Sequence, residues 1–387
     1  MQYRLRPHAP TPQCPRGARF LQPRLGHRRT VAALACLALS AGAAHAQSAV
    51  MIYGRLNVSL EHADASRSPR DRSINRESNN RSVIGFRGTE DLGDGLQAVF
   101  QIEGSLALDT GAGPSLANRD TRVGLQSPYG LVFLGHWGTP YLLATSTLDP
   151  WYPTTAGYMA LMANGSGPTV SHTSNTASFD RRQQNIVQYW TPAWNGLTGR
   201  VAYALNDGEI GPNGSRPDLW SASVAWDQGP WNLSLAHEAH RDYQGPGLTD
   251  SATKLGAAYR FGPGRLAGAV EHLRYETPLG ALTRDAFFIA ATWQIQRFNL
   301  RASFTHAADG HGPAGARVGF ISAGPDTGSR QWTLGADYTL SPRTGLYAYV
   351  SRIDNQARAA YDFAINPLGV GVGEKPSVVA LGLRHSF

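Results

Sequence analysis

The stretch RSVIGFRGTEDLGDGLQAVFQIEG, residues Arg81 to Gly104, has the most regular pattern in the chain. Two runs in which apolar and polar residues alternate flank an acidic, glycine-rich segment, EDLGDG, at 90–95. Alternation with a period of two predicts β-strands, and a polar glycine-rich segment between them predicts a tight turn. The stretch therefore predicts a β-hairpin with one apolar and one polar face, and it contains no catalytic motif.

Similar segments recur along the chain. After residue 46 no apolar run is long enough for a transmembrane helix, which needs about 18 residues or more. Strands are predicted instead, and their boundaries follow from the alternation and from the turn residues. Sixteen segments qualify: 50–62, 81–90, 95–108, 119–127, 130–138, 182–191, 196–206, 217–227, 230–241, 251–261, 264–276, 284–296, 297–308, 329–340, 343–355 and 376–387.

The connections between these strands alternate in length. The short ones are EDLGDG, SPYG, TPAWNG, DQGP, GPG, QIQR and SPR, which are rich in turn residues. The long ones span about 63–80, 109–118, 139–181, 207–216, 242–250, 277–283, 309–328 and 356–375. In a soluble β-sandwich, the short and the long connections would not be separated onto opposite ends of the strands. The pattern predicts an all-β fold, a 16-stranded antiparallel transmembrane β-barrel with short periplasmic turns, long extracellular loops and an apolar face toward lipid.

The first 46 residues differ from the rest. They contain seven arginines, both cysteines and no acidic residue, so the remainder has 28 basic and 28 acidic residues and does not favour nucleic-acid binding. A basic segment, an apolar segment at 31–44 and the sequence Ala-His-Ala predict a secretory signal peptide. We expect cleavage between Ala46 and Gln47. Residues 1–46 are then an N-terminal extension and signal, and residues 47–387 form the barrel domain.

Three motifs point to a known family. FRGTEDLGDGLQAVFQIEG (86–104), RDTRVGLQSPYGLVFLGHWGTPY (119–141) and GLRHSF (382–387) make the chain resemble the general diffusion porins of Gram-negative bacteria, particularly those of the β-proteobacterial type. The resemblance implies a homotrimer of water-filled channels in the bacterial outer membrane, through which ions and small hydrophilic solutes diffuse passively. It implies contacts with outer-membrane lipid and lipopolysaccharide. It also implies that the outer-membrane assembly machinery reads the terminal Phe387, and it implies no cofactor.

The third long loop, 139–181, is the longest connection. In the family that the chain resembles, this loop folds into the barrel and narrows it. Its many apolar and aromatic residues fit packing against an inner wall. A barrel of this size leaves an aqueous lumen, which an inward loop would constrict to set a size limit.

Charge at such a narrowing would determine which ions pass. The polar strand parity places six arginines toward the lumen: Arg55, Arg81, Arg87, Arg122, Arg182 and Arg200. The loop contributes the acids Asp149 and Asp180. By position in the motifs, Arg119 and Arg182 match members of a basic cluster that opposes the loop in related porins, whereas Val83 stands where many relatives have a third basic residue. We expect a mild anion preference.

An alternative for each lumenal arginine is a solvated wall residue paired with an acid. The available acids are Glu61, Glu103 and Asp120. Parity does not place Arg119, because it lies at a strand end.

Two further functional classes compete with a general porin. A solute-specific channel for a sugar or organic anion could use aromatic residues in or near the third loop: Trp137, Tyr141, Trp151, Tyr152 and Tyr158. An enzyme or an adhesin is a remote alternative. In HEAH, at 237–240, the two histidines are three apart on a predicted strand and therefore point to opposite faces. We expect no metal site, no catalytic residue and no enzyme activity.

Overall fold

The computed structural model describes residues 50–66, 72–113, 115–152, 155–159, 161–165, 177–206 and 214–387. The expected signal peptide and its cleavage site at Ala46 and Gln47 lie outside these residues. Residues Ser48–Phe387 belong to one compact unit. In the part of the chain that the structure describes, no helix is long and apolar enough to cross a membrane.

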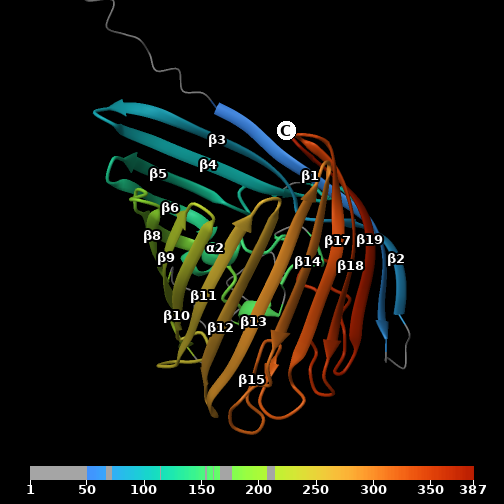
Figure 1. Ribbon diagram of the computed structural model, residues 1–387. Helices are drawn as coiled ribbons and strands as arrows, with labels where there is room; N and C mark the ends of the chain where they lie inside the picture. Colours follow the sequence, from blue (N-terminus) through green and yellow to red (C-terminus); the bar gives the residue numbers. More distant parts are fainter. Residues whose placement is uncertain are drawn as a thin grey trace, which may run out of the picture. The chain divides into compact units, whose positions relative to one another are not determined.

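The wall consists of 16 antiparallel strands, each hydrogen-bonded to its sequence neighbour (Figure 1). They are β1 (Val50–Ser66), β3 (Ser82–Gly93), β4 (Leu96–Leu106), β5 (Thr121–Ser127), β6 (Gly130–Gly138), β7 (Arg182–Trp190), β8 (Leu197–Ala204), β9 (Asp218–Gln228), β10 (Trp231–Arg241), β11 (Thr249–Phe261), β12 (Gly264–Thr277), β13 (Gly280–Ile295), β14 (Phe298–Ala307), β17 (Ser329–Ser341), β18 (Thr344–Asn355) and β19 (Lys375–Ser386). These elements confirm the 16 predicted strands, including the turn at Gln296.

The first and last strands close the sheet into a barrel. β1 pairs with β19 from Arg55 opposite Ser386 to Ser66 opposite Lys375. Beyond this ladder, Gly54 and Phe387 exchange two backbone hydrogen bonds of 3.1 Å. The ring of Phe387 lies directly over Gly54, where an added Cβ would be 2.4 Å from the ring. The terminal residue therefore completes the seam and requires a glycine opposite it.

The two faces of each strand have the predicted character. On β1 the side chain of Leu60 is 67% exposed, whereas its neighbours Ser59 and Glu61 are buried. On β19 Val379 and Leu381 are likewise exposed. Apolar residues on the outer face of a closed barrel contact lipid, and the polar parity faces the lumen. On the opening hairpin, Ile102 is likewise exposed and Glu103 is buried, which agrees with the predicted orientation.

Aromatic residues gather on the outer face near the short turns. Ring pairs there are Trp231 with Tyr259 at 4.5 Å and Phe298 with Tyr338 at 4.8 Å between centroids. Tryptophan and tyrosine concentrate at membrane–water boundaries because they combine an apolar ring with a polar group. These pairs therefore mark the membrane boundary on the short-turn edge.

Three connections differ from the predicted loops. The connection predicted at 63–80 contains the strand β2 (Arg72–Asn79), which pairs with the far half of β1. The long loop predicted at 277–283 is wrong: Thr277 pairs with Gly280, so β12 and β13 continue into a tight turn. The connection at 309–328 contains the small hairpin of β15 (Arg317–Val318) and β16 (Ile321–Ser322), at the bottom of Figure 1. Strand pairing thus continues beyond the membrane-spanning part of the wall. The sequence there does not alternate between apolar and polar residues, so alternation does not predict these strands.

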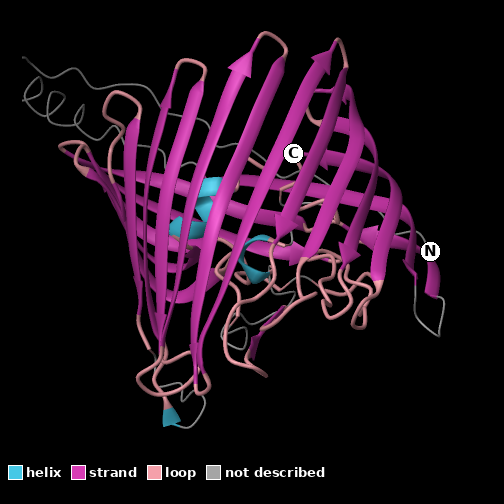
Figure 2. Ribbon diagram, turned by 60° about the horizontal axis from the view of Figure 1, so that its bottom comes forward, coloured by secondary structure: helices cyan, strands magenta, loops and turns pink. Residues whose placement is uncertain are grey.

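The third long connection folds inward, as predicted. It contains α2 (Pro140–Thr145) and η1 (Met162–Asn164), and Figure 2 shows α2 enclosed by the strands. The hydroxyl of Thr139 caps α2 by accepting a hydrogen bond from the Leu142 amide. Across the lumen, the Trp151 indole donates to Ser303 Oγ of β14 at 2.9 Å. The loop is therefore packed against the inner wall.

We expect Gly54→Leu to impair closure of the barrel. A side chain at this position meets both the Phe387 ring and the Val83 carbonyl oxygen, and overpacking of this kind costs about 1–3 kcal/mol or more. Refolding of the variant into detergent, followed by the mobility of unheated and heated samples in gels, measures the folded fraction. Gly113→Leu is the control, because an added side chain there meets open space. A wild-type folded fraction for Gly54→Leu would contradict the tight seam.

Candidate pore constriction

Two ion pairs stand on the inner wall near the beginning of β5, with partners on β4 and at the start of β7. Arg119 directly precedes β5, and its Nε lies 2.8 Å from Oε1 of Glu103 on β4. Arg182 begins β7 and donates two hydrogen bonds to the Asp120 carboxylate, at 2.8 and 3.2 Å. Such paired contacts fix the direction of each guanidinium group. The alternative pairing considered for these arginines is therefore present, with Glu103 and Asp120 as the partners.

A break in the strand places Arg81 beside these pairs. Asn80 and Arg81 separate β2 from β3, and Arg81 has a positive φ of 55°. Side-chain hydrogen bonds stabilise this break. Asn57 Nδ2 donates to the Asn80 carbonyl at 3.3 Å, and the backbone N–H of Asn57 donates to Ser82 Oγ at 2.9 Å. The Arg81 guanidinium lies within electrostatic range of Arg119 and Arg182. A third basic group thus joins the wall, although Val83 occupies the position where the family resemblance would place it.

Arg55 extends this group of charges along the wall. Its Nη2 donates to the Arg81 carbonyl oxygen at 3.1 Å, and Arg119 and Arg182 are among its electrostatic neighbours. We call Arg55, Arg81, Arg119 and Arg182 the arginine cluster. The four arginines accompany two carboxylates, Glu103 and Asp120, so the cluster retains two net positive charges.

The third loop faces the arginine cluster with tyrosines. Tyr152 and Tyr158 both lie within electrostatic range of Arg81, and their rings are 5.5 Å apart. Tyr152 also lines a cavity of about 390 Å³, together with Arg55, Asp337 and Arg384. Basic side chains therefore continue from the cluster onto β19, where Arg384 stands on the inner face.

Buried charges hold the loop to the opposite wall. Nζ of Lys254, on β11, lies 2.8 Å from Oδ1 of Asp180 and 3.7 Å from Oε2 of Glu271 on β12. Arg284, on β13, lies 2.7 Å from Oε1 of Glu271 and donates to the Leu161 carbonyl of the loop. All four charged side chains are almost completely buried. We call Lys254, Asp180, Glu271 and Arg284 the loop anchor.

Glu271 is the centre of the loop anchor. Its carboxylate also accepts hydrogen bonds from the Tyr141 hydroxyl at 2.8 Å and from the Ala163 amide at 2.7 Å. One wall side chain thus contacts both the beginning and the later part of the loop. Removal of any one of these partners would leave a buried charge uncompensated, which is costly.

The two loop acids expected at the narrowing are not exposed to pore water. Asp180 belongs to the loop anchor and also accepts a hydrogen bond from the Tyr158 hydroxyl. Asp149 is buried and accepts hydrogen bonds from the amides of Trp151 and Met159, both at 2.8 Å. Burial raises the pKa of Asp149 to about 7. In this structure the loop uses both acids for its own folding, and their contribution to the constriction stays a prediction.

The aromatic residues considered for a solute slide are mostly buried as well. Trp137, Tyr141, Trp151 and Tyr158 are each at most 7% exposed, and only Tyr152 is partly accessible. Four of the five side chains therefore pack the loop and the wall and do not form a surface for a passing sugar.

The remaining predicted arginines stack on aromatic rings of the inner wall. Arg122 lies 4.3 Å from the ring centroid of Trp137 and 5.2 Å from that of Trp190, and Arg200 lies 4.8 Å from the ring centroid of Trp190. Arg87 lies 5.1 Å from the ring of Tyr53, near the short turns. These three positions share the lumenal parity but are separate from the arginine cluster.

Sequence reasoning missed Lys254, Glu271 and Arg284. A signal was present, because all three are charged residues on the inward parity of consecutive predicted strands. Lys254 is moreover one of only two lysines in a chain that otherwise uses arginine. A compact ammonium group reaches several acceptors in a small buried space, where a planar guanidinium group fits less easily.

The HEAH segment behaves as its strand position predicts. His237 points outward, and its ring centroid lies 5.2 Å from that of Trp220. His240 points inward and lies 2.7 Å from the Glu238 carboxylate. Among the residues that the structure describes, no group of three or more potential ligands could hold a metal ion.

A closed 16-stranded barrel with an apolar exterior, a polar lumen and an inward-folded loop defines a diffusion channel of the bacterial outer membrane. The chain belongs to the family of Gram-negative porins, whose model matches residues 32–358. Members of this family are channel proteins and not enzymes.

Individual relatives agree with this assignment. The chain is 28% identical to outer membrane porin protein 32 of Delftia acidovorans, covering 93% of this chain and 100% of the relative. It is 27% identical to an outer membrane porin protein of Bordetella pertussis, with the same coverage. Among solved structures, the anion-selective porin from Comamonas acidovorans has a TM-score of 0.73 and 25% identity, covering 88% of this chain and 100% of that chain.

We expect Lys254→Met to release the third loop from the wall. Asp180 loses its ion-pair partner in the interior, and removal of one member of a buried pair costs about 3–5 kcal/mol. Limited proteolysis of the refolded variant measures cleavage within 139–181, while gel mobility verifies that the barrel remains folded. Lys375→Met, at the other lysine, is the matched control. Equal cleavage of the variant and wild-type protein would show that the loop does not depend on the anchor.

Stability should also depend on the ionisation of Asp149. Its folded pKa of about 7 lies above the value of about 3.9 for an unfolded aspartate. The folded state therefore loses stability as the pH rises from about 4 to about 7, by at most about 1.4 kcal/mol per pH unit. Thermal unfolding at pH 5 and pH 8 should show a larger loss for the wild type than for Asp149→Asn. Equal losses would exclude Asp149 as the titrating group.

Proposed function

We propose that this porin is a general diffusion channel with a mild preference for small anions. The observation that carries the proposal is the arginine cluster, with four guanidinium groups and two carboxylates on the wall that faces the third loop. The similarity to the anion-selective porin from Comamonas acidovorans supports the same direction of preference.

The ion pairs of the cluster do not cancel this preference. Glu103 and Asp120 hold Arg119 and Arg182 in fixed directions, and Arg55 and Arg81 add positive charge beside them. In a narrow pore with low-dielectric walls, a net positive charge raises the local concentration of anions and lowers that of cations. Because Asp149 and Asp180 are buried in the loop, they contribute no opposing ring of exposed acids.

The other arginines extend the basic surface toward the short-turn mouth. Arg87, Arg122 and Arg200 stand on the inner wall with their guanidinium groups against aromatic rings. Stacking keeps each charge at the wall and leaves the centre of the lumen open. We assign them a supporting role, in which anions leaving the cluster meet further positive charge.

We propose that the signal peptide is cleaved between Ala46 and Gln47 during export. We also propose that the mature protein forms a homotrimer. Support for the trimer comes from the family and from a solved trimer form of OmpT of Vibrio cholerae with the same fold, at a TM-score of 0.64 and 13% identity. The proposed assembly signal is Phe387, which the folded barrel then uses to complete its seam with Gly54.

Conductance measurements test the channel and its preference. In a planar bilayer, the refolded protein should give discrete conductance steps, and reversal potentials in a salt gradient should indicate anion preference. Arg119→Gln/Arg182→Gln should lower the anion-to-cation permeability ratio severalfold, because a unit charge at about 4 Å contributes about 1 kcal/mol even in bulk water.

Arg297→Gln, in the exposed turn between β13 and β14, is the matched control and should leave the permeability ratio unchanged. An unchanged ratio in the double variant would contradict the role of the arginine cluster. Block of the current by a low concentration of one sugar or organic anion would favour a solute-specific channel instead.

A further inference from the structure

The inner wall has a recess near the short-turn ends of β17, β18 and β19. In this row Thr339 of β17 is opposite Gly345 of β18, and Gly345 is opposite Arg384 of β19. Within the described part of the chain, a Cβ added to Gly345 would meet only the Tyr338 carbonyl oxygen, at 3.4 Å. The absence of a side chain at Gly345 therefore leaves a space between the Thr339 and Arg384 side chains.

This recess is part of the cavity of about 390 Å³ that Tyr152 of the third loop also lines. The cavity extends from Tyr152 to the turn between β17 and β18 and to Ser386, next to the end of the chain. Because the third loop is inside the barrel, the cavity belongs to the lumen. Its volume lies in the range of about 300–1,000 Å³ that is usual for sites of small molecules.

Three arginines line the cavity: Arg55 of β1, Arg343 of the turn between β17 and β18, and Arg384 of β19. The Arg55 Nε is buried and has no hydrogen-bond partner among the described residues. Arg343 is exposed, and its guanidinium group makes no ion pair with any residue that the structure describes. Two of the three guanidinium groups thus have donors available for a ligand.

One acid, Asp337 of β17, stands in the same lining. Its Oδ1 lies 2.6 Å from Nη2 of Arg301, which is outside the lining, and 3.9 Å from Nη2 of Arg384. Three bases and one acid give the lining two net positive charges, and the acid already has a partner of its own. The cavity therefore favours an anionic ligand.

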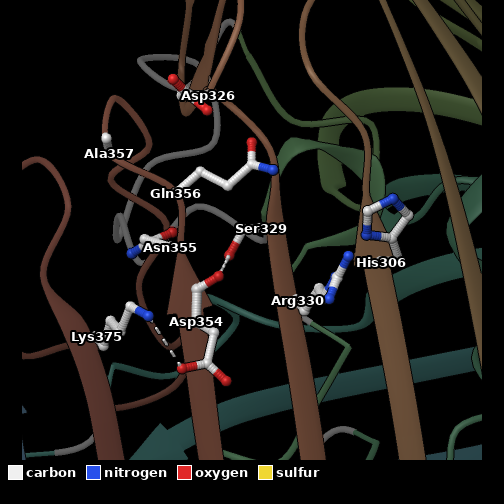
Figure 3. A pocket seen from close by; sticks show the side chains of 9 residues that line it. All are labelled: His306, Asp326, Ser329, Arg330, Asp354, Asn355, Gln356, Ala357 and Lys375. Carbon is white, nitrogen blue, oxygen red and sulfur yellow. Dashed lines mark hydrogen bonds and ion pairs between the residues drawn. The ribbon is translucent and has the colours of Figure 1, made fainter.

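A second polar cavity, at the extracellular ends of β14, β17, β18 and β19, lacks this excess (Figure 3). Its lining has two acids, Asp326 and Asp354, and two bases, Arg330 and Lys375. Asp354 lies 3.8 Å from Lys375. Because these charges balance, positive charge in excess distinguishes the lumenal cavity from the extracellular one.

Hydroxyl groups surround the arginines of the lumenal cavity. Thr339 and Ser341 share the inward parity of β17, and Ser386 lies on β19. Ser341 Oγ accepts hydrogen bonds from the amides of Arg343 and Thr344, at 3.3 and 3.1 Å, so its own O–H remains a donor. Hydroxyl groups both donate and accept, which matches the hydroxyl groups of a sugar or polyol. Guanidinium groups match the oxygens of a phosphate.

We propose that the lumenal cavity binds the phosphate ester of a small sugar or polyol. The phosphate lies between Arg343 and Arg384, and the hydroxyl groups of the ligand face Thr339, Ser341 and Ser386. The inference rests on the proposed function, because the solute must enter an open lumen, and it adds a class of solute to that function. Binding and ion preference are measured separately, so that either can fail alone.

Isothermal titration of the refolded protein in detergent tests the site. The probes are glucose 6-phosphate, glucose and inorganic phosphate. Arg343→Gln/Arg384→Gln should weaken binding of glucose 6-phosphate about tenfold or more, since two charge-assisted contacts are lost. Gly345→Val fills the recess and retains all three arginines, and it should also weaken this binding. The reversal potential of Gly345→Val should equal that of the wild type.

Arg330→Gln/Lys375→Gln removes two positive charges from the extracellular cavity and is the matched control, which should bind glucose 6-phosphate as the wild type does. Gel mobility verifies that each variant is folded. Wild-type affinity in Arg343→Gln/Arg384→Gln, or in Gly345→Val, would overturn the proposal. Equally tight binding of glucose would also overturn it, by showing that the phosphate is not recognised. Equally tight binding of inorganic phosphate would do so by showing that the hydroxyl groups contribute nothing.

Discussion

Backbone hydrogen bonding in lipid is the constraint on which this structure depends. A strand within hydrocarbon has no water to satisfy its N–H and C=O groups, so a sheet that crosses the membrane must have no free edge. The seam between β1 and β19 meets this requirement, and the two hydrogen bonds between Gly54 and Phe387 carry it to the last residue. The closed ladder then fixes the alternation of the whole wall, with apolar side chains outside and polar ones inside.

Closure creates a second problem, because a barrel of 16 strands encloses more space than its own side chains can fill. The third loop occupies part of this space, and the loop anchor holds it there. A cluster of four charges without water would be costly if any member lacked a partner. Here Glu271 is shared by Lys254, Arg284, Tyr141 and the loop backbone. The wall opposite the arginine cluster therefore holds the loop, whereas the Arg119 and Arg182 side chains of the cluster, each about one-tenth exposed, stand on the other wall.

The same separation explains the electrostatics of the channel. Acids that belong to the loop are buried for packing, whereas the acids of the wall fix the directions of Arg119 and Arg182. Positive charge remains in excess on the lumenal side. On the outer face, polar and charged residues occur at the extracellular end. Charged residues thus occur in three separate places: on the lumenal wall, buried in the loop, and at the extracellular end of the outer face.

The sequence by itself determined the 16 strands, the lipid-facing parity and the long third loop, because these depend on local periodicity and turn chemistry. The family resemblance of its motifs also pointed to Arg119 and Arg182 as candidate residues of the constriction. Only the tertiary structure decided that Arg81 enters the cluster, because the break at Asn80 is held by Asn57 of another strand. Likewise, the sequence predicts Asp180 as a pore acid, and only the fold pairs it with Lys254, 74 positions away. The alternation along a strand predicts the side of the wall on which a residue lies. Which distant residue it contacts depends on how the whole barrel folds.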